Sequence, residues 1–162
     1  RHIARKGRPM ILSSAMTRME EVVEAVAAVR EEGLEDVAVL QCTGNYPANL
    51  SDSNLRVMQT YRDQLNCIVG CSDHTLDLIN PVAATAMGAK VYEKHFTIDK
   101  TLPGPDHRMS LEQEVSFFPA FAKPNLYYYL AWSMYPGLLS VVFTEARNAC
   151  VFISRSRPRT RL

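Results

Sequence analysis

The stretch Lys90-Val91-Tyr92-Glu93-Lys94-His95-Phe96-Thr97 decides the fold prediction, because it joins a strand pattern to ionisable side chains. β-Branched and aromatic residues are frequent in it, and such residues favour β-strands. Side chains two residues apart in a strand share a face, so Glu93 and His95 point to the same side as Val91. We therefore predict a strand that carries a carboxylate and an imidazole on one face.

Three earlier runs of apolar and β-branched residues recur at intervals of about thirty residues, which is the length of a strand plus a returning helix. These runs are Met10–Ser13, Val37–Thr43 and Cys67–Ser72. Short, nearly continuous apolar runs at that spacing are typical of parallel strands that helices cover.

Helix signals follow each run. Thr17–Glu20 forms a Thr-x-x-Glu capping box, and Gly33 supplies a stop after the helix that this box predicts. Amphipathic or apolar patterns over Leu55–Leu65 and Leu76–Met87 predict two more helices, and a second capping box at Ser110–Gln113 predicts another. The chain is therefore α/β, and both an open doubly wound sheet and part of a (β/α)₈ barrel satisfy the pattern.

Polar residues crowd the C-terminal ends of the predicted strands, which form the active face in either architecture. His74 and His95 lie at two neighbouring strand ends. Adjacent strands stand about 4.8 Å apart, so the two imidazoles can converge on one divalent ion, with Glu93 or Asp106 supplying charge or orientation. Taken singly, each histidine is better interpreted as a hydrogen-bonded polar residue than as a ligand. The gathering of serines, Asn45, Tyr46 and both histidines on one face favours a site.

The loop Leu102–His107 follows the last predicted strand and places two prolines around a glycine. One interpretation is a rigid turn. The other is that the loop holds Asp106 over the strand ends as a hydrogen-bond acceptor. His107 stays unassigned, because a solvated loop position explains it equally well.

Composition narrows the functional class. The chain has 162 residues, of which 47% are apolar, and a formal net charge of +1, so the first 120 residues show no basic field for nucleic acid. The four cysteines form no C-x-x-C pair, and no secretory signal opens the sequence. We expect a reduced, cytoplasmic setting.

The character of the sequence changes near residue 125. Leu126–Phe143 approaches the length of a membrane span, but Pro136-Gly137 interrupts it and several tyrosines lie in it, so we do not expect a membrane helix. Arg155–Leu162 has the composition of a disordered basic tail. We divide the chain into residues 1–124, which hold the strand–helix units, and residues 125–162, a divergent apolar and then arginine-rich tail.

Five blocks together resemble the signature of the sialic acid synthases, in the same order and with compatible spacings. These blocks are Pro9–Met16, Leu40–Pro47, Ser72–Thr75, Glu93–Thr97 and Gly104–His107. The resemblance runs from about Gly7 to about Glu114.

The resemblance implies an enzyme that condenses phosphoenolpyruvate with an N-acetylated amino sugar, commonly N-acetylmannosamine, to give a nine-carbon 2-keto acid and phosphate. It implies that His74 and His95 bind Mn²⁺ or Mg²⁺, and that Glu93 and Asp106 have catalytic roles. The residues that it places at the substrates are Ser13, Asn45 and Ser72 for phosphoenolpyruvate, and Tyr46 and Asp106 for the sugar.

For the fold, the resemblance implies a partial (β/α)₈ TIM barrel, with the four predicted strands as strands five to eight. Strands one to four and an antifreeze-like domain are then not part of this sequence, and the family's homodimer is the expected full-length assembly. We expect the fragment by itself to be inactive and to expose two unpaired strand edges. Two alternatives stay open: a non-catalytic truncated relative, and an unrelated metal-dependent hydrolase on a β/α scaffold.

Overall fold

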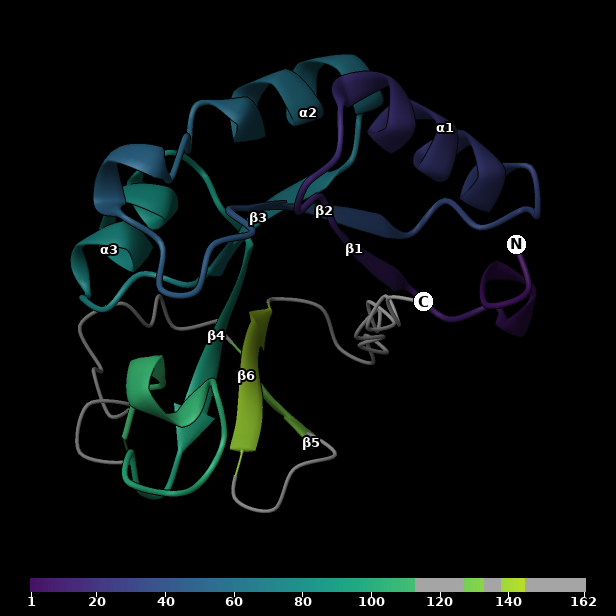
Figure 1. Cartoon of the computed structure of the whole chain (residues 1–162). Coiled ribbons are helices and arrows are strands. Elements are labelled where there is room, and N and C mark those ends of the chain that lie inside the picture. Colours follow the sequence, from purple (N-terminus) through teal and green to yellow (C-terminus); the bar gives the residue numbers. More distant parts are fainter. Residues whose placement is uncertain (113–126, 133–137, 145–162) are drawn as a thin grey trace, which may run out of the picture.

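The computed structural model describes residues 1–112, 127–132 and 138–144 (Figure 1). Four strands alternate with three helices: β1 (Met10–Ser13), α1 (Met19–Arg30), β2 (Val37–Cys42), α2 (Val57–Leu65), β3 (Ile68–Asp73), α3 (Ile79–Ala86) and β4 (Val91–Thr97). Short 3₁₀ helices are η1 (Ala4–Lys6), η2 (Leu50–Asp52) and η3 (His107–Met109). A hairpin of β5 (Tyr127–Trp132) and β6 (Leu138–Thr144) follows. All four predicted strands are confirmed within one residue at each end.

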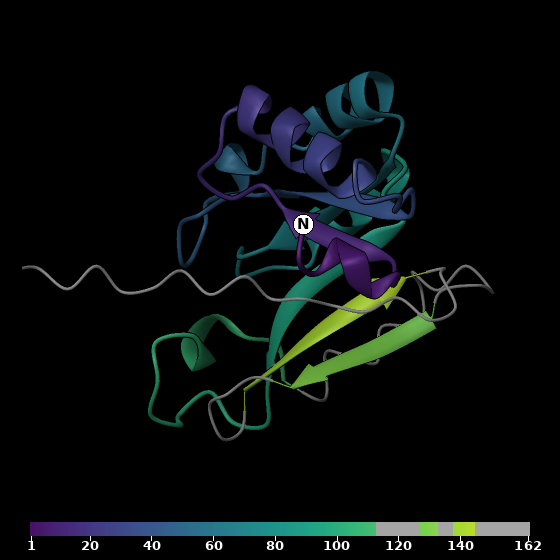
Figure 2. The same ribbon diagram turned by 90° about the vertical axis from the view of Figure 1, so that its right-hand side faces the viewer.

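Strands β1 to β4 are parallel neighbours in chain order and form a curled half-barrel. All three helices contribute side chains to a single core on one side of this sheet, as Val26, Met58 and Ala84 show. An open doubly wound sheet would carry helices on both faces, so the barrel-like alternative is the correct one. Figure 2 shows α1 and α2 together over that face.

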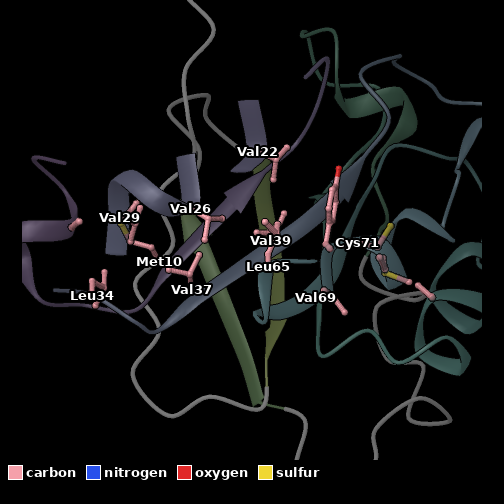
Figure 3. Close-up of a cluster of buried hydrophobic side chains, with 14 residues drawn as sticks. Met10, Val22, Val26, Val29, Leu34, Val37, Val39, Leu65, Val69 and Cys71 are labelled. Atoms are coloured by element: carbon pink, nitrogen blue, oxygen red, sulfur yellow. The ribbon is translucent and has the colours of Figure 1, made fainter. Parts of the chain in front are cut away.

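The core follows the two-residue period of the strands. In β2, Val37 and Val39 face the helices within the main cluster (Figure 3), whereas Ala38 and Leu40 pack on the opposite side of the sheet. Burying a valine or methionine side chain of this kind contributes about 1.5–3 kcal/mol each. This alternation decides which polar side chains reach the concave side at the strand ends.

Two helix starts differ from the prediction. Helix α1 begins after Arg18, whose backbone N–H donates to Glu21 Oε2 at 2.7 Å. This contact of a glutamate with the N-cap backbone lies one residue later than the predicted contact of Glu20 with Thr17. The Thr17 hydroxyl is already used, because it donates to the carbonyl of Ser14 at 2.7 Å. After η3, Leu111 forms a bridge with Phe96 in place of a helical turn. The rest of that predicted helix lies outside the described residues.

The edge of β4 is paired, which corrects the expectation of two open edges. Strand β6 runs antiparallel to β4, and β5 pairs with β6 to end the sheet. The apolar stretch predicted to be a divergent tail therefore contains two strands, in keeping with its tyrosine, tryptophan and valine content. No helix among the described residues has the length and apolarity that crossing a bilayer requires. Residues 155–162 lie outside the described part of the chain.

Candidate functional site

The concave side of the sheet collects the predicted polar residues from β3 and β4. Ser72 and Glu93 are register partners, and the Ser72 hydroxyl donates to Glu93 Oε1 at 2.6 Å. His74 lies two residues beyond Ser72, and His95 two residues beyond Glu93. The predicted sharing of one face by these four side chains is thus borne out in their contacts.

The two histidines lie close together beneath an aromatic ring. Their ring centroids are 5.5 Å apart with an interplanar angle of 51°. Tyr46, from the loop after β2, stacks on His74 at 3.8 Å and meets His95 edge-on at 5.7 Å. Because nitrogen–metal bonds are about 2.1 Å long, rings at this separation are near enough to share one ion.

His74 is held in one tautomer. Its Nδ1 lies 2.7 Å from the carbonyl oxygen of Thr43, and a carbonyl only accepts, so Nδ1 carries the proton and donates it. The lone pair of Nε2 is then available to a ligand. The Cys42 thiol also lies near, with its sulfur 3.9 Å from Nδ1.

His95 differs, because its Nδ1 is buried and has no hydrogen-bond partner among the described residues. Leaving a buried polar atom without a partner costs free energy, so such atoms in folded proteins call for an explanation such as an ion. Burial lowers the pKa of His95 to about 4, although the negative charge of Asp106 opposes the shift. Burial also lowers the pKa of His74, against the hydrogen bond to Thr43.

The ring nitrogens of His74 and His95 are suitable ligands for a divalent ion. A histidine that binds a metal must be neutral. The lowered pKa values of His74 and His95 keep both rings neutral at pH 7. In the described segments no set of three or more histidine, cysteine, aspartate or glutamate side chains is arranged to hold a metal. The described residues would therefore supply such an ion with two ligands of these types, His74 and His95.

Glu93 is the one carboxyl group on β4, two residues before His95. Burial raises its pKa, and the hydrogen bond from Ser72 lowers it in part. A carboxyl group shifted upward in this way is better suited to proton transfer near neutral pH than an exposed glutamate.

The remaining predicted residues surround the cluster at different depths. Ser13 is exposed at the end of β1, beside the Cys42 thiol. Asn45 is exposed on the loop before Tyr46. Asp106 is half-buried, and its charge acts on both histidines. Loops from β2 and β4 thus border the histidine pair, with Ser13 farther along the same row of strand ends.

His107, left unassigned from the sequence, is buried and fixes the Asp106 loop. The Thr97 hydroxyl donates to the carbonyl of Asp99 at 3.0 Å, so it accepts from His107 Nδ1 at 2.7 Å. The interpretation of His107 as a solvated loop residue is wrong, since its exposed fraction is 1%. A histidine next to Asp106 in a proline–glycine loop was the available signal.

Sequence reasoning missed a buried polar network behind the histidines. Lys94 Nζ donates to Asp73 Oδ2 and to the carbonyl of Thr75, both at 2.5 Å. Asn80 Nδ2 donates to Asp73 Oδ1 at 2.8 Å, and the Tyr92 hydroxyl donates to Asp73 Oδ2. The signal was an acid and a base that each directly precede a site histidine.

Known proteins resemble the first two thirds of the chain. Residues 1–116 match the NeuB family. N,N'-diacetyllegionaminic acid synthase of Legionella pneumophila is 48% identical over 117 residues, which cover 70% of this chain and 33% of that protein.

Solved structures agree with this match. The crystal structure of spore coat polysaccharide biosynthesis protein SpsE from Bacillus subtilis superimposes with a TM-score of 0.67 at 41% identity, over 70% of this chain and 32% of that one. N-acetylneuraminic acid synthetase from Leptospira borgpetersenii, in complex with citrate, gives a TM-score of 0.65 at 34% identity, over 69% and 39%. The chain spans only about a third of the length of these relatives. The chain belongs to the NeuB family, whose named relatives here include sugar acid synthases.

Proposed function

We propose that residues 1–116 are the metal-binding half of a NeuB synthase barrel that condenses phosphoenolpyruvate with an N-acetylated amino sugar such as N-acetylmannosamine. The four parallel strands would be strands five to eight of that barrel. The observation that carries the proposal is the pair of rings 5.5 Å apart at His74 and His95, in a chain of this family. The product would be a nine-carbon 2-keto acid.

We propose that His74 Nε2 and the imidazole of His95 hold Mn²⁺ or Mg²⁺. The ion, when bound, supplies Lewis-acid polarisation of the sugar's aldehyde oxygen. The residues around it do the rest of the positioning. Thr43 orients His74, and Tyr46 covers one face of that ring, which limits where a sugar can enter.

Glu93 is the proposed proton acceptor for the water that adds to C2 of the enol substrate. Its raised pKa supports that role, as does the Ser72 hydroxyl that holds Oε1 at 2.6 Å. The Ser72 hydroxyl donates its one proton to Glu93, and the anionic oxygens of phosphoenolpyruvate only accept hydrogen bonds. The predicted contact of Ser72 with phosphoenolpyruvate therefore requires the hydroxyl to rotate away from Glu93.

Ser13 and Asn45 are proposed donors to the anionic groups of phosphoenolpyruvate, and Tyr46 and Asp106 are proposed sugar contacts. Serine and asparagine donate hydrogen bonds but do not neutralise charge. Two anionic groups therefore need cations from elsewhere in a complete barrel. We expect the 162-residue polypeptide alone to release no phosphate from phosphoenolpyruvate and N-acetylmannosamine with Mn²⁺.

A chimera tests the proposal directly. Residues 1–116 would replace the matching third of the Legionella pneumophila synthase, and phosphate release would be measured with and without Mn²⁺ for that enzyme's own sugar and for N-acetylmannosamine. We expect metal-dependent turnover. His74→Ala and His95→Ala should each reduce it by more than the roughly 10- to 100-fold that loss of an outer-shell partner costs.

His2→Ala is the matched control, because His2 is an exposed histidine distant in sequence from the site. It should leave turnover unchanged. A folded chimera whose turnover survives both site substitutions would refute the assignment of the metal ligands.

A further inference from the structure

Each histidine of the site directly follows one member of a buried ion pair. Asp73 and Lys94 are register partners on β3 and β4, and they point toward the helices. His95 is the next residue on β4 and His74 directly follows the end of β3, and their rings meet on the concave side. The ion pair and the histidine pair are thus opposite faces of the same strand ends.

The ion pair holds the backbone of Thr75, the residue after His74. Asp73 Oδ1 accepts from the backbone N–H of Thr75 at 2.9 Å, and Lys94 Nζ donates to the Thr75 carbonyl at 2.5 Å. Asn80 of α3 donates to the same carboxylate. The segment that carries His74 is therefore bound to β4 and to α3 through one carboxylate and one ammonium group.

Stability alone gives a weak reason for such a pair. Asp73 and Lys94 are each only 2% exposed. Burying two charges costs several kcal/mol per ion, so well-packed apolar residues often replace a buried pair without loss of stability. Burial raises the pKa of Asp73, but the Lys94 ammonium and the hydrogen bonds outweigh it and the net pKa is lowered, which keeps the carboxylate ionised.

We propose that Asp73 and Lys94 are positioning residues that set the distance and orientation of the His74 and His95 rings. The inference rests on the proposed function for its purpose, which is metal binding, but the geometry that it claims can be measured without metal.

The test uses the full chain and the double variant Asp73→Asn/Lys94→Met, which keeps both side-chain volumes and leaves no charge buried alone. Arg5→Met/Glu32→Gln is the matched control, since it makes the same kind of change in the pair of Arg5 and Glu32 on the exterior, with Arg5 Nε 2.7 Å from Glu32 Oε2. Two quantities are measured: nuclear Overhauser effects among the ring protons of Tyr46, His74 and His95 without metal, and the Kd for Mn²⁺ by calorimetry.

We expect the unmodified chain and the control to show contacts between the His74 ring and both neighbouring rings. In the double variant these contacts should weaken or vanish, and the Kd for Mn²⁺ should rise about 10- to 100-fold, as for loss of outer-shell support. A cooperative thermal transition must persist. Unchanged ring contacts in a folded variant would overturn the proposal.

Asp73→Leu/Lys94→Met replaces the first variant if that one loses its cooperative transition. Should both fail to fold, the pair is needed for folding itself and the positioning proposal is overturned. If the unmodified chain shows the ring contacts but binds no Mn²⁺, the metal part of the proposed function fails, while the ring contacts of the variants still decide the positioning.

Discussion

The polar groups on the two faces of β3 and β4 differ in how fully they are hydrogen-bonded. On the helix-facing side, Asp73 accepts hydrogen bonds from five groups and Lys94 donates two. On the concave side, His95 keeps a buried nitrogen without a partner among the described residues. On the helix-facing side the protein itself satisfies the hydrogen-bonding groups of Asp73 and Lys94. On the concave side, imidazole nitrogens are available to a ligand. A site needs both, because groups left for a ligand must be held in place by other contacts.

Breaking the helix-facing network should have the largest effect. Lys94→Met leaves the Asp73 carboxylate buried without its cation, which should lower the free energy of unfolding by about 3–5 kcal/mol. Urea denaturation followed by circular dichroism measures the loss. Arg5→Met, which breaks an exposed pair, should leave the transition unchanged. Equal transitions for the two variants would contradict the contrast between buried and exposed pairs.

Forcing the two strands apart should come next. A Cβ at Gly70 would overlap the backbone carbonyl oxygen of Val91 and lie 2.6 Å from Leu40 Cδ2, so Gly70→Ala should cost about 1–3 kcal/mol of unfolding free energy as an overpacked site. Gly44→Ala is the matched control. Its Cβ would meet only the side chain of Met16, which is 91% exposed and free to move. A smaller loss at Gly70 than at Gly44 would show that β3 and β4 are not so closely packed.

Removing the histidines one at a time compares a satisfied ring with an unsatisfied one. Without metal, His74→Ala loses the bond to Thr43 and the stack on Tyr46, so it should cost about 1–2 kcal/mol of unfolding free energy. His95→Ala removes a buried nitrogen that no described residue hydrogen-bonds, so it should cost less unfolding free energy. Thermal unfolding with and without Mn²⁺ completes the comparison, since both variants should lose any stabilisation by metal. If His95→Ala lost more unfolding free energy than His74→Ala without metal, the result would contradict the assignment of His95 Nδ1 as a nitrogen without a hydrogen bond.

The smallest effect is expected at Ser72. Ser72→Ala removes one hydrogen bond to Glu93 and should cost about 0.5–1.5 kcal/mol of unfolding free energy near neutral pH. That bond favours the ionised carboxylate, so its loss should raise the pKa of Glu93 further. When the pKa of a carboxyl group is higher in the folded state than in the unfolded state, the group lowers stability at pH values where it is ionised in the unfolded chain. This loss of stability disappears at acid pH, where the group is protonated in both states.

The destabilisation by Ser72→Ala should therefore shrink as the pH falls below the usual range for glutamate. Ser51→Ala is a suitable control, because the Ser51 hydroxyl donates to an exposed carboxylate, that of Asp52. If the destabilisation by Ser72→Ala grew as the pH fell, the result would contradict the assignment of an ionised Glu93 as the acceptor.

Much of the site was predictable from residue spacing. The period of two in a strand assigns Glu93 and His95 to one face, and the strand-plus-helix interval makes β3 and β4 neighbours, so the meeting of His74 and His95 followed. The hydrogen bond from Ser72 to Glu93 was not predictable, because it depends on the register between two strands. The burial of His107 likewise depends on how the loop after β4 folds back onto Thr97.

Local periodicity and order along the chain were enough to specify four strands, the face on which each polar side chain lies, and membership of a recognisable family. These properties depend on neighbours in sequence, which a strand arranges by its own geometry. Tertiary structure alone decided that Asp73 bonds to Lys94 and that β6 covers the edge of β4. It also decided that one His95 nitrogen has no hydrogen-bond partner within the described part of the chain. Such contacts join residues far apart in the chain, and their energies exist only once packing has excluded water from between them.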